Sequence, residues 1–149
     1  MSNTLQTLLK SYNQQSFATD FGSVIHSKMQ HIFFDDTGAA IGDPEIISKV
    51  SNNDELRKLM GPLSRAEVPI AGTVSGRFIS RRIDRLYINN KDKKIVVLDY
   101  KTDTDKRMYI EKYRVQLNEY RSLLKQIYPD FMVSCKILWL SDFTLENID

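Results

Sequence analysis

The order of hydrophobic patterns along the 149 residues predicts an α/β fold, in which a mixed central β-sheet is flanked by helices. Apolar residues recur at three- and four-residue spacing over residues 22–34 and 109–127, which is typical of amphipathic helices. A nearly continuous β-branched run at residues 94–100, mixed alternation over 78–88 and an apolar run at 132–140 indicate strands. Helices, a strand hairpin, a further helix and a last strand together predict an α/β sandwich around one sheet.

The chain length suits one domain with one hydrophobic core. We expect residues 1–21 to be a lead-in, either a short helix over residues 4–17 or a flexible segment, and residues 22–149 to be the folded domain. The predicted elements are a helix at 22–34, a turn at 35–38, helices at 44–50 and 53–60, a strand at 67–71, a turn at 72–76, a strand at 78–88, a hairpin turn at 89–93, a strand at 94–100, a helix at 109–127 and a strand at 132–140. The nearly continuous β-branched run at 94–100 is usual for a strand covered on both faces.

Composition excludes several classes of protein. The sequence has no run of some twenty apolar residues, so no membrane-spanning helix is expected, and its start lacks the pattern of a signal peptide. The single Cys135 lies in an apolar run, which predicts a buried, inert thiol and excludes an internal disulfide or a Cys₄ iron–sulfur cluster. The sequence contains no Gly-x-x-x-x-Gly-Lys-Ser/Thr loop, so no ATP site is expected. We therefore expect a cytoplasmic protein that does not associate with membranes.

Positive charge is concentrated in the middle of the chain. The formal net charge is only +2, but residues 72–126 hold 14 Lys/Arg against 7 Asp/Glu, an excess of 7. A basic region of this kind suits a polyanionic partner, although a solvated charged surface has the same composition. Charge alone does not distinguish the two.

Two aspartates and a lysine are predicted to converge on one point of the sheet. Asp84 and Asp99 lie on adjacent strands joined by a short turn, so their carboxylates can face each other. Opposed like charges destabilise a sheet unless a cation lies between them. Lys101 follows Asp99 by two residues, which places both side chains on the same face of the strand. Carboxylates supply the oxygen ligands that Mg²⁺ requires, and the ammonium can position an attacking water or stabilise charge on a phosphate. The plainer alternative is an Asp–Lys salt bridge at the end of a strand.

Three blocks in this region carry a family resemblance. They are Ile83-Asp84-Arg85-Leu86, then Val97-Leu98-Asp99-Tyr100-Lys101-Thr102, then Gln116-Leu117-Asn118-Glu119-Tyr120. In order and approximate spacing they resemble the "G-x-x-D", "D-Y-K-T" and "Q-x-x-x-Y" motifs of the RecB-like branch of the PD-(D/E)xK nucleases. Two further segments, residues 64–72 and 137–140, look closest to the C-terminal nuclease domain of AddA-type helicase–nucleases of double-strand-break repair. The resemblance implies a restriction-endonuclease-like core and covers the chain from about Gly22 onward.

The resemblance also implies a metal site. Asp84 and Asp99 would be metal ligands, with help from the backbone carbonyl of Tyr100, and Lys101 would be the catalytic lysine. Upstream, residues 22–26 look like the helical histidine motif of the family, so His26 would be a further ligand. Glu67 would be a catalytic acidic residue near the metal. The cofactor implied is Mg²⁺, with Mn²⁺ as a substitute. By contrast, His31 is expected to be a surface or packing residue.

Other residues are expected to order the site or to contact DNA. Gln116 and Tyr120, one helical turn apart, would lie over the site and contact DNA or order the lysine, although Tyr120 also belongs to a helical stripe that suits the core. Arg81, Arg82 and Arg85 are candidates to follow a DNA backbone. Arg81 stands where the family has the glycine of "G-x-x-D".

The function expected is metal-dependent hydrolysis of DNA phosphodiester bonds, as the nuclease module of a recombinational DNA-repair helicase–nuclease. The expected partners are DNA, single-stranded at the active site, and a helicase domain or subunit. One alternative is a degenerate nuclease-fold domain that binds DNA or a helicase without cleaving. Another is a plain interaction domain, which would need no metal.

Overall fold

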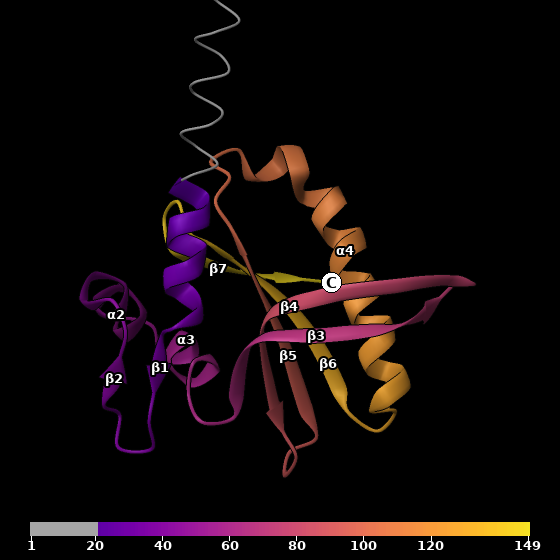
Figure 1. The fold of residues 1–149 in the computed structure, drawn as a ribbon, viewed down its shortest axis with the longest axis horizontal. Coiled ribbons are helices and arrows are strands. Elements are labelled where there is room, and N and C mark those ends of the chain that lie inside the picture. Colours follow the sequence, from indigo (N-terminus) through magenta and orange to yellow (C-terminus); the bar gives the residue numbers. More distant parts are fainter. Residues whose placement is uncertain (1–20) are drawn as a thin grey trace, which may run out of the picture.

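The computed structural model describes residues 21–149, and its centre is a five-stranded mixed sheet with helices on both faces (Figure 1). The strands lie in the order β3-β4-β5-β6-β7, and every neighbouring pair is antiparallel except β5 and β6. Their bounds are Ser64–Val74 for β3, Arg77–Asn89 for β4, Lys94–Lys101 for β5, Met132–Trp139 for β6 and Thr144–Ile148 for β7. The predicted α/β class with a mixed, helix-flanked sheet is therefore confirmed.

Helix α4 (Lys106–Ile127) joins the two parallel strands and covers one face of the sheet. Parallel neighbours cannot be joined by a tight hairpin, so the connection has to cross the sheet. Asp105 caps the helix, because its side chain accepts a hydrogen bond from the backbone N–H of Met108 at 3.3 Å. The cap explains why the helix begins before residue 109, where the apolar periodicity placed its start.

The other face of the sheet is covered by helices from the first part of the chain. They are the helix of residues 21–30 (indigo in Figure 1), α2 (Pro44–Ser51) and α3 (Asp54–Leu59). The side chains of Asp43 and Asn53 cap α2 and α3, respectively. Both short helices thus lie close to their predicted positions.

A small hairpin replaces the end of the first predicted helix. The helix reaches only residue 30, and β1 (Phe33–Phe34) instead pairs with β2 (Ala40–Ile41). Asp35 organises the turn between them, because its carboxylate accepts hydrogen bonds from the backbone N–H groups of Thr37 and Ala39, both at 2.9 Å. The prediction of a helix to residue 34 was wrong because Ile32 and Phe33 continue the three- and four-residue spacing of Met29, although both lie beyond the helix and Phe33 belongs to β1.

Side chains of β5 alternate between two hydrophobic cores. Ile95 and Val97 belong to the core beneath α4, whereas Leu98 and Tyr100 belong to the core beneath the N-terminal helices. All four are at most 3% exposed, which confirms that this strand is covered on both faces. Asp99 and Lys101 follow Val97 at two-residue steps, so they lie on the α4 side of the sheet.

Strand β4 changes its orientation at Asp84. Ile83 is buried in the core beneath α4, whereas Arg85, two positions later, contacts backbone carbonyls of Met29 and Ile32 on the other side of the sheet. Residues two apart share a face in a straight strand, so β4 must coil sharply here. In the described part of the chain, residues 77–84 pair with β3 alone, and this long ribbon crosses in front of β5 and reaches past α4 (Figure 1). We call this two-stranded ribbon, residues 67–84, the arm.

The arm is longer than the sequence predicted. Residues 72–74, which were expected to be a turn, continue β3, and the turn is confined to Ser75 and Gly76. A Cβ atom on Gly72 would lie 2.7 Å from Leu123 Cδ2 of α4, so the glycine allows close packing rather than a turn. The last strand, β7, was not predicted, since its five residues alternate weakly at the edge of the sheet.

No helix among residues 21–149 is long and apolar enough to cross a membrane. The predicted lead-in, apart from Phe21 in the first helix, lies outside the described residues.

Candidate metal centre

The centre forms where β4 and β5 separate. Their last paired positions are Arg85 and Leu98, and the next positions on each strand are Asp84 and Asp99. The backbone N–H of Tyr100 donates a hydrogen bond to Asp84 Oδ2 at 2.8 Å, so a carboxylate bridges the two strands where the ladder ends. The two aspartates thus face each other across the opening, as predicted from their positions on two adjacent strands joined by a short turn.

His26 and Glu67 join Asp84 from two other elements. One potential ligand atom of each of these three residues lies within 4.8 Å of the others, which is compact enough to hold a metal ion. His26 Nε2, on the first helix, is 3.0 Å from Asp84 Oδ1. Glu67 occupies the position of β3 opposite Asp84, between the pairs Ala66–Arg85 and Val68–Ile83. Its φ of 56° is a strained conformation for a residue with a side chain, and such strain is common at functional sites.

Asp99 and Lys101 complete the cluster from β5. Asp99 Oδ2 lies 3.0 Å from Lys101 Nζ, so the two side chains do share a face of the strand. Their contact is an ion pair without the alignment of a hydrogen bond. Asp99 Oδ2 and Glu67 Oε1 are buried atoms with no hydrogen-bond partner among residues 21–149. Asp99 Oδ2 still has the Lys101 ammonium beside it, whereas a buried oxygen such as Glu67 Oε1 is rare and costly, and a bound cation would satisfy it.

The electrostatics of the cluster show excess negative charge. Burial and the neighbouring charge of Asp84 raise the pKa of Asp99 to about 7, even though Lys101 opposes the rise. Burial would also raise the pKa of Asp84, but hydrogen bonds from His26 and the Tyr100 N–H outweigh it and lower that pKa. The hydrogen bond to Asp84 raises the pKa of His26, and its partial burial opposes this only in part. Asp99 is therefore the carboxylate of the pair that takes up a proton first as the pH falls.

Helix α4 holds Lys101 from the opposite side. The ammonium donates a hydrogen bond to Gln116 Oε1 at 3.2 Å, and Gln116 Nε2 in turn donates to the hydroxyl of Tyr120 at 3.0 Å. Lys101 Nζ also lies 4.3 Å from the ring centroid of Tyr113, whose hydroxyl donates to Asp103 Oδ2. Gln116 and Tyr120 are thus placed where they order the lysine, while Tyr120 is only 2% exposed.

Tyr113 is a member of the site that the sequence analysis did not identify. Its spacing from Leu117 and Tyr120 also fits the helical stripe that suits the core. The available signal was its position one turn before Gln116, which places both side chains on the same face of the helix.

The DNA-binding role predicted for Arg85 is wrong. Arg85 is 2% exposed and donates hydrogen bonds to the Tyr100 hydroxyl and to the backbone carbonyls of Met29 and Ile32. The sharp coil of β4 at Asp84 turns this side chain inward, so it joins the first helix to the sheet. A buried guanidinium in this position cannot reach a DNA backbone.

The other two arginines are on the surface. Arg82 is close to the centre, since its guanidinium lies 3.7 Å from Glu67 Oε2 and its side chain is 68% exposed. Arg81 lies on the opposite face of β4, where it approaches Glu119 of α4 at 3.9 Å. The structure places Tyr100 with its backbone N–H toward Asp84, and the role of its carbonyl as a metal ligand stays a prediction.

Residues outside the centre occupy the places expected of them. Cys135 and Trp139 are buried in the core beneath α4, and burial raises the pKa of the Cys135 thiol to about 11. His31 is exposed.

Neither a comparison with known protein families nor one with curated protein sequences finds a match for this chain. The residues of the centre therefore indicate what the chain can do.

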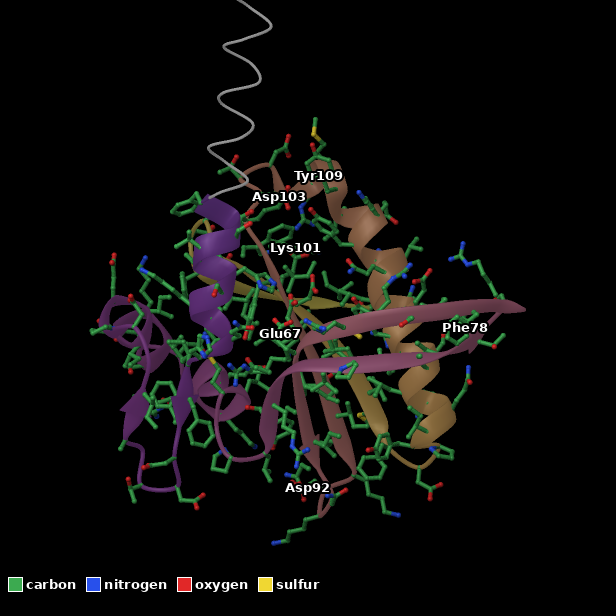
Figure 2. The ribbon with its side chains drawn as sticks, in the orientation of Figure 1. Glu67, Phe78, Asp92, Lys101, Asp103 and Tyr109 are labelled. Atoms are coloured by element: carbon green, nitrogen blue, oxygen red, sulfur yellow. The ribbon has the colours of Figure 1, made fainter. Side chains whose placement is uncertain are left out.

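This arrangement can bind a divalent cation and act on a negatively charged substrate. One imidazole and three carboxylates suit Mg²⁺ or Mn²⁺, which prefer oxygen ligands and tolerate a histidine. Lys101 adds a fixed positive charge beside the carboxylates. Lys101 lies between the first helix and α4, above the start of the arm, where Glu67 lies (Figure 2).

Proposed function

We propose that the chain is a metal-dependent nuclease domain of the RecB-like PD-(D/E)xK type, which hydrolyses DNA phosphodiester bonds. The observation that carries the proposal is the convergence of five side chains from four elements, namely His26, Glu67, Asp84, Asp99 and Lys101. A salt bridge at a strand end would need only the Asp99–Lys101 pair. It would not explain why a second aspartate, a histidine and a strained glutamate surround the same point.

The residues fit a bound metal. The buried Glu67 Oε1, which finds no hydrogen-bond partner in residues 21–149, is the observation that favours a cation. In the proposal His26, Glu67, Asp84 and Asp99 hold Mg²⁺, with Mn²⁺ able to replace it. The ion would supply a Lewis acid for the phosphate and would lower the pKa of a bound water.

Lys101 would act on the substrate rather than on the metal. An ammonium has no lone pair for a cation, so its charge serves the phosphate oxygens or the attacking water. The hydrogen bond to Gln116 and the ring of Tyr113 hold Lys101 Nζ in place before substrate arrives. A group that is already positioned needs no reorganisation in the transition state, which is the main source of such electrostatic catalysis.

The order of motifs and the mixed sheet with its α4 crossover support a restriction-endonuclease-like core. In this proposal a helicase domain or subunit supplies a single DNA strand to the centre. The chain without such a partner should still cut, because all five central residues come from this chain.

The test is incubation of the full chain with end-labelled single- and double-stranded DNA, together with Mg²⁺, Mn²⁺ or EDTA. We expect cleavage with either metal and none with EDTA. Binding of DNA without cleavage under all three conditions would favour a degenerate domain that only binds. Metal-independent behaviour with no DNA affinity would indicate an interaction domain instead.

A further inference from the structure

The outer face of the arm is exposed and leads to the candidate centre. Pro69, Ala71 and Thr73 of β3 lie opposite Arg82, Ser80 and Phe78 of β4, and all six residues are exposed. The inner face of the same ribbon, which includes Ile70, Ile79 and Ile83, is buried against α4. One face of the arm is therefore anchored, and the other is available to a partner.

Phe78 is the unusual residue on this face. At 70% it is the most exposed large hydrophobic side chain among residues 21–149, and it lies near the far end of the arm (Figure 2). An isolated apolar side chain on a surface needs no explanation by itself. Here, however, it continues a line through Ser80 to Arg82, whose guanidinium lies 3.7 Å from Glu67 of the centre.

The charge of the outer face favours an anion. Arg82 is the one charged residue among the six exposed residues of this face, which carries no carboxylate. Arg77 and Arg81 lie on the inner face, where they approach Glu119 of α4 at 3.0 Å and 3.9 Å. An acidic peptide would satisfy the charge of Arg82 as well, but Phe78 on the same face suits the flat face of a base.

We infer that the outer face of the arm binds single-stranded DNA, with Phe78 stacked on a base and Arg82 on a phosphate beside the centre. The inference rests on the proposed nuclease function, because the strand continues into the centre. Six residues separate Phe78 from Asp84, which corresponds to about 20 Å along a strand. That distance equals about six nucleotides at the stacked rise of about 3.4 Å, and fewer if the DNA is extended.

Aromatic stacking suits a nuclease that reads no sequence. Every base has a flat face, so a single phenylalanine holds the strand without choosing among bases. The small side chains of Ala71 and Ser80 leave room for a base or sugar to lie flat on the ribbon.

The experiment measures binding of a fluorescein-labelled 12-nucleotide single strand by anisotropy, in EDTA, so that no cleavage interferes. We expect Phe78→Ala to weaken binding roughly 5- to 150-fold, the range that loss of one stacked base produces. Phe78→Trp should keep the wild-type affinity. Met132→Ala is the matched control, because Met132 is 69% exposed at the start of β6, and it should bind as the wild type does.

A series of strands with one abasic site each identifies the stacked base. An abasic site at one position should weaken binding of the strand to the wild type. The same abasic site should have no effect on binding to Phe78→Ala, since the stacking contact is already lost there.

Equal DNA affinity of Phe78→Ala and wild type, or no DNA binding by the wild type, would overturn the inference. A change in sedimentation of Phe78→Ala with unchanged DNA binding would instead assign the face to contact between two copies of the chain. If the arm binds DNA as expected but no metal supports cleavage, the nuclease proposal fails and the arm inference stands.

Discussion

At the scale of single residues, Lys101 is proposed to act in the chemical step and not in metal binding. It lies 3.0 Å from Asp99 Oδ2, yet it cannot itself bind a cation. Its two contacts with α4, to Gln116 and to the ring of Tyr113, hold it on the α4 side of the carboxylates. Its loss should therefore affect the rate and spare the metal.

We expect Lys101→Ala to cleave DNA about a hundred- to thousand-fold more slowly at saturating metal, the usual cost of losing one preorganised charge. Metal should bind at least as tightly as in the wild type, because a repelling charge has gone. Calorimetric Mg²⁺ titration beside single-turnover cleavage measures both effects. Lys91→Ala, on the exposed β4–β5 turn, is the control. Weakened metal binding with normal turnover at saturating metal would show that the lysine is structural.

At the scale of elements, Arg85 determines how the first helix meets the sheet. Its guanidinium donates hydrogen bonds to the carbonyl of Met29, near the end of the helix that carries His26, at 3.0 Å and to that of Ile32, just after the helix, at 2.9 Å. The same side chain binds the hydroxyl of Tyr100 at 3.0 Å. Arg85, which the sequence suggested as a DNA-binding residue, thus holds the first helix and the sheet together.

Arg85→Ala should lower the free energy of unfolding by about 3 kcal/mol or more, because several buried carbonyls lose a charged donor. Arg85→Lys should recover only part of this, since an ammonium cannot reproduce the planar fork. Urea denaturation followed by circular dichroism measures the change. The control is Arg82→Ala, because the side chain of Arg82 is 68% exposed on the same strand. It should shift the free energy of unfolding by no more than about 0.5 kcal/mol. An Arg85→Ala protein as stable as wild type would refute the bridging role.

The predicted and observed positions of the residues show which parts of the centre follow from sequence alone. Asp99 and Lys101 follow from the two-residue period of a strand, and Asp84 follows from counting back across the hairpin. His26 and Glu67 came only from the family resemblance, because no local pattern places a helix or an edge strand beside a particular residue. Arg85 could not be placed, since alternation assumes a straight strand and β4 coils at Asp84. Tyr113 was not predicted because residues of a core stripe and residues that contact Lys101 from α4 have the same helical spacing.

At the scale of the whole molecule, the centre links stability to pH. The pKa of Asp99 is raised to about 7, so between about pH 4 and 7 the folded chain retains a proton that the unfolded chain loses. The pKa of His26 is also raised, so its contribution is present below its ordinary range and is lost as pH rises through the folded value. Asp84 has the opposite sign, but its lowered pKa acts only below the ordinary range of aspartate.

Without metal, the melting temperature should therefore fall as pH rises from 5 to 8. Added Mg²⁺ should reverse much of the fall at pH 8, because it binds the deprotonated ligands that repel one another. Asp99→Asn should flatten the metal-free profile, whereas Asp92→Asn in the exposed turn should leave it unchanged. Thermal melts at fixed ionic strength give these profiles. A metal-free melting temperature that rises between pH 5 and 8 would contradict the assignment.

The central claim is that the facing aspartates hold the metal that cleaves DNA. Single-turnover cleavage of end-labelled single-stranded DNA in Mg²⁺, by wild type, Asp84→Asn, Asp99→Asn and the control Asp92→Asn, tests it most directly. We predict cleavage by the wild type and the control, and loss of cleavage in both site variants while their circular dichroism spectra remain those of the folded chain. Near-wild-type cleavage by either folded site variant would contradict the claim.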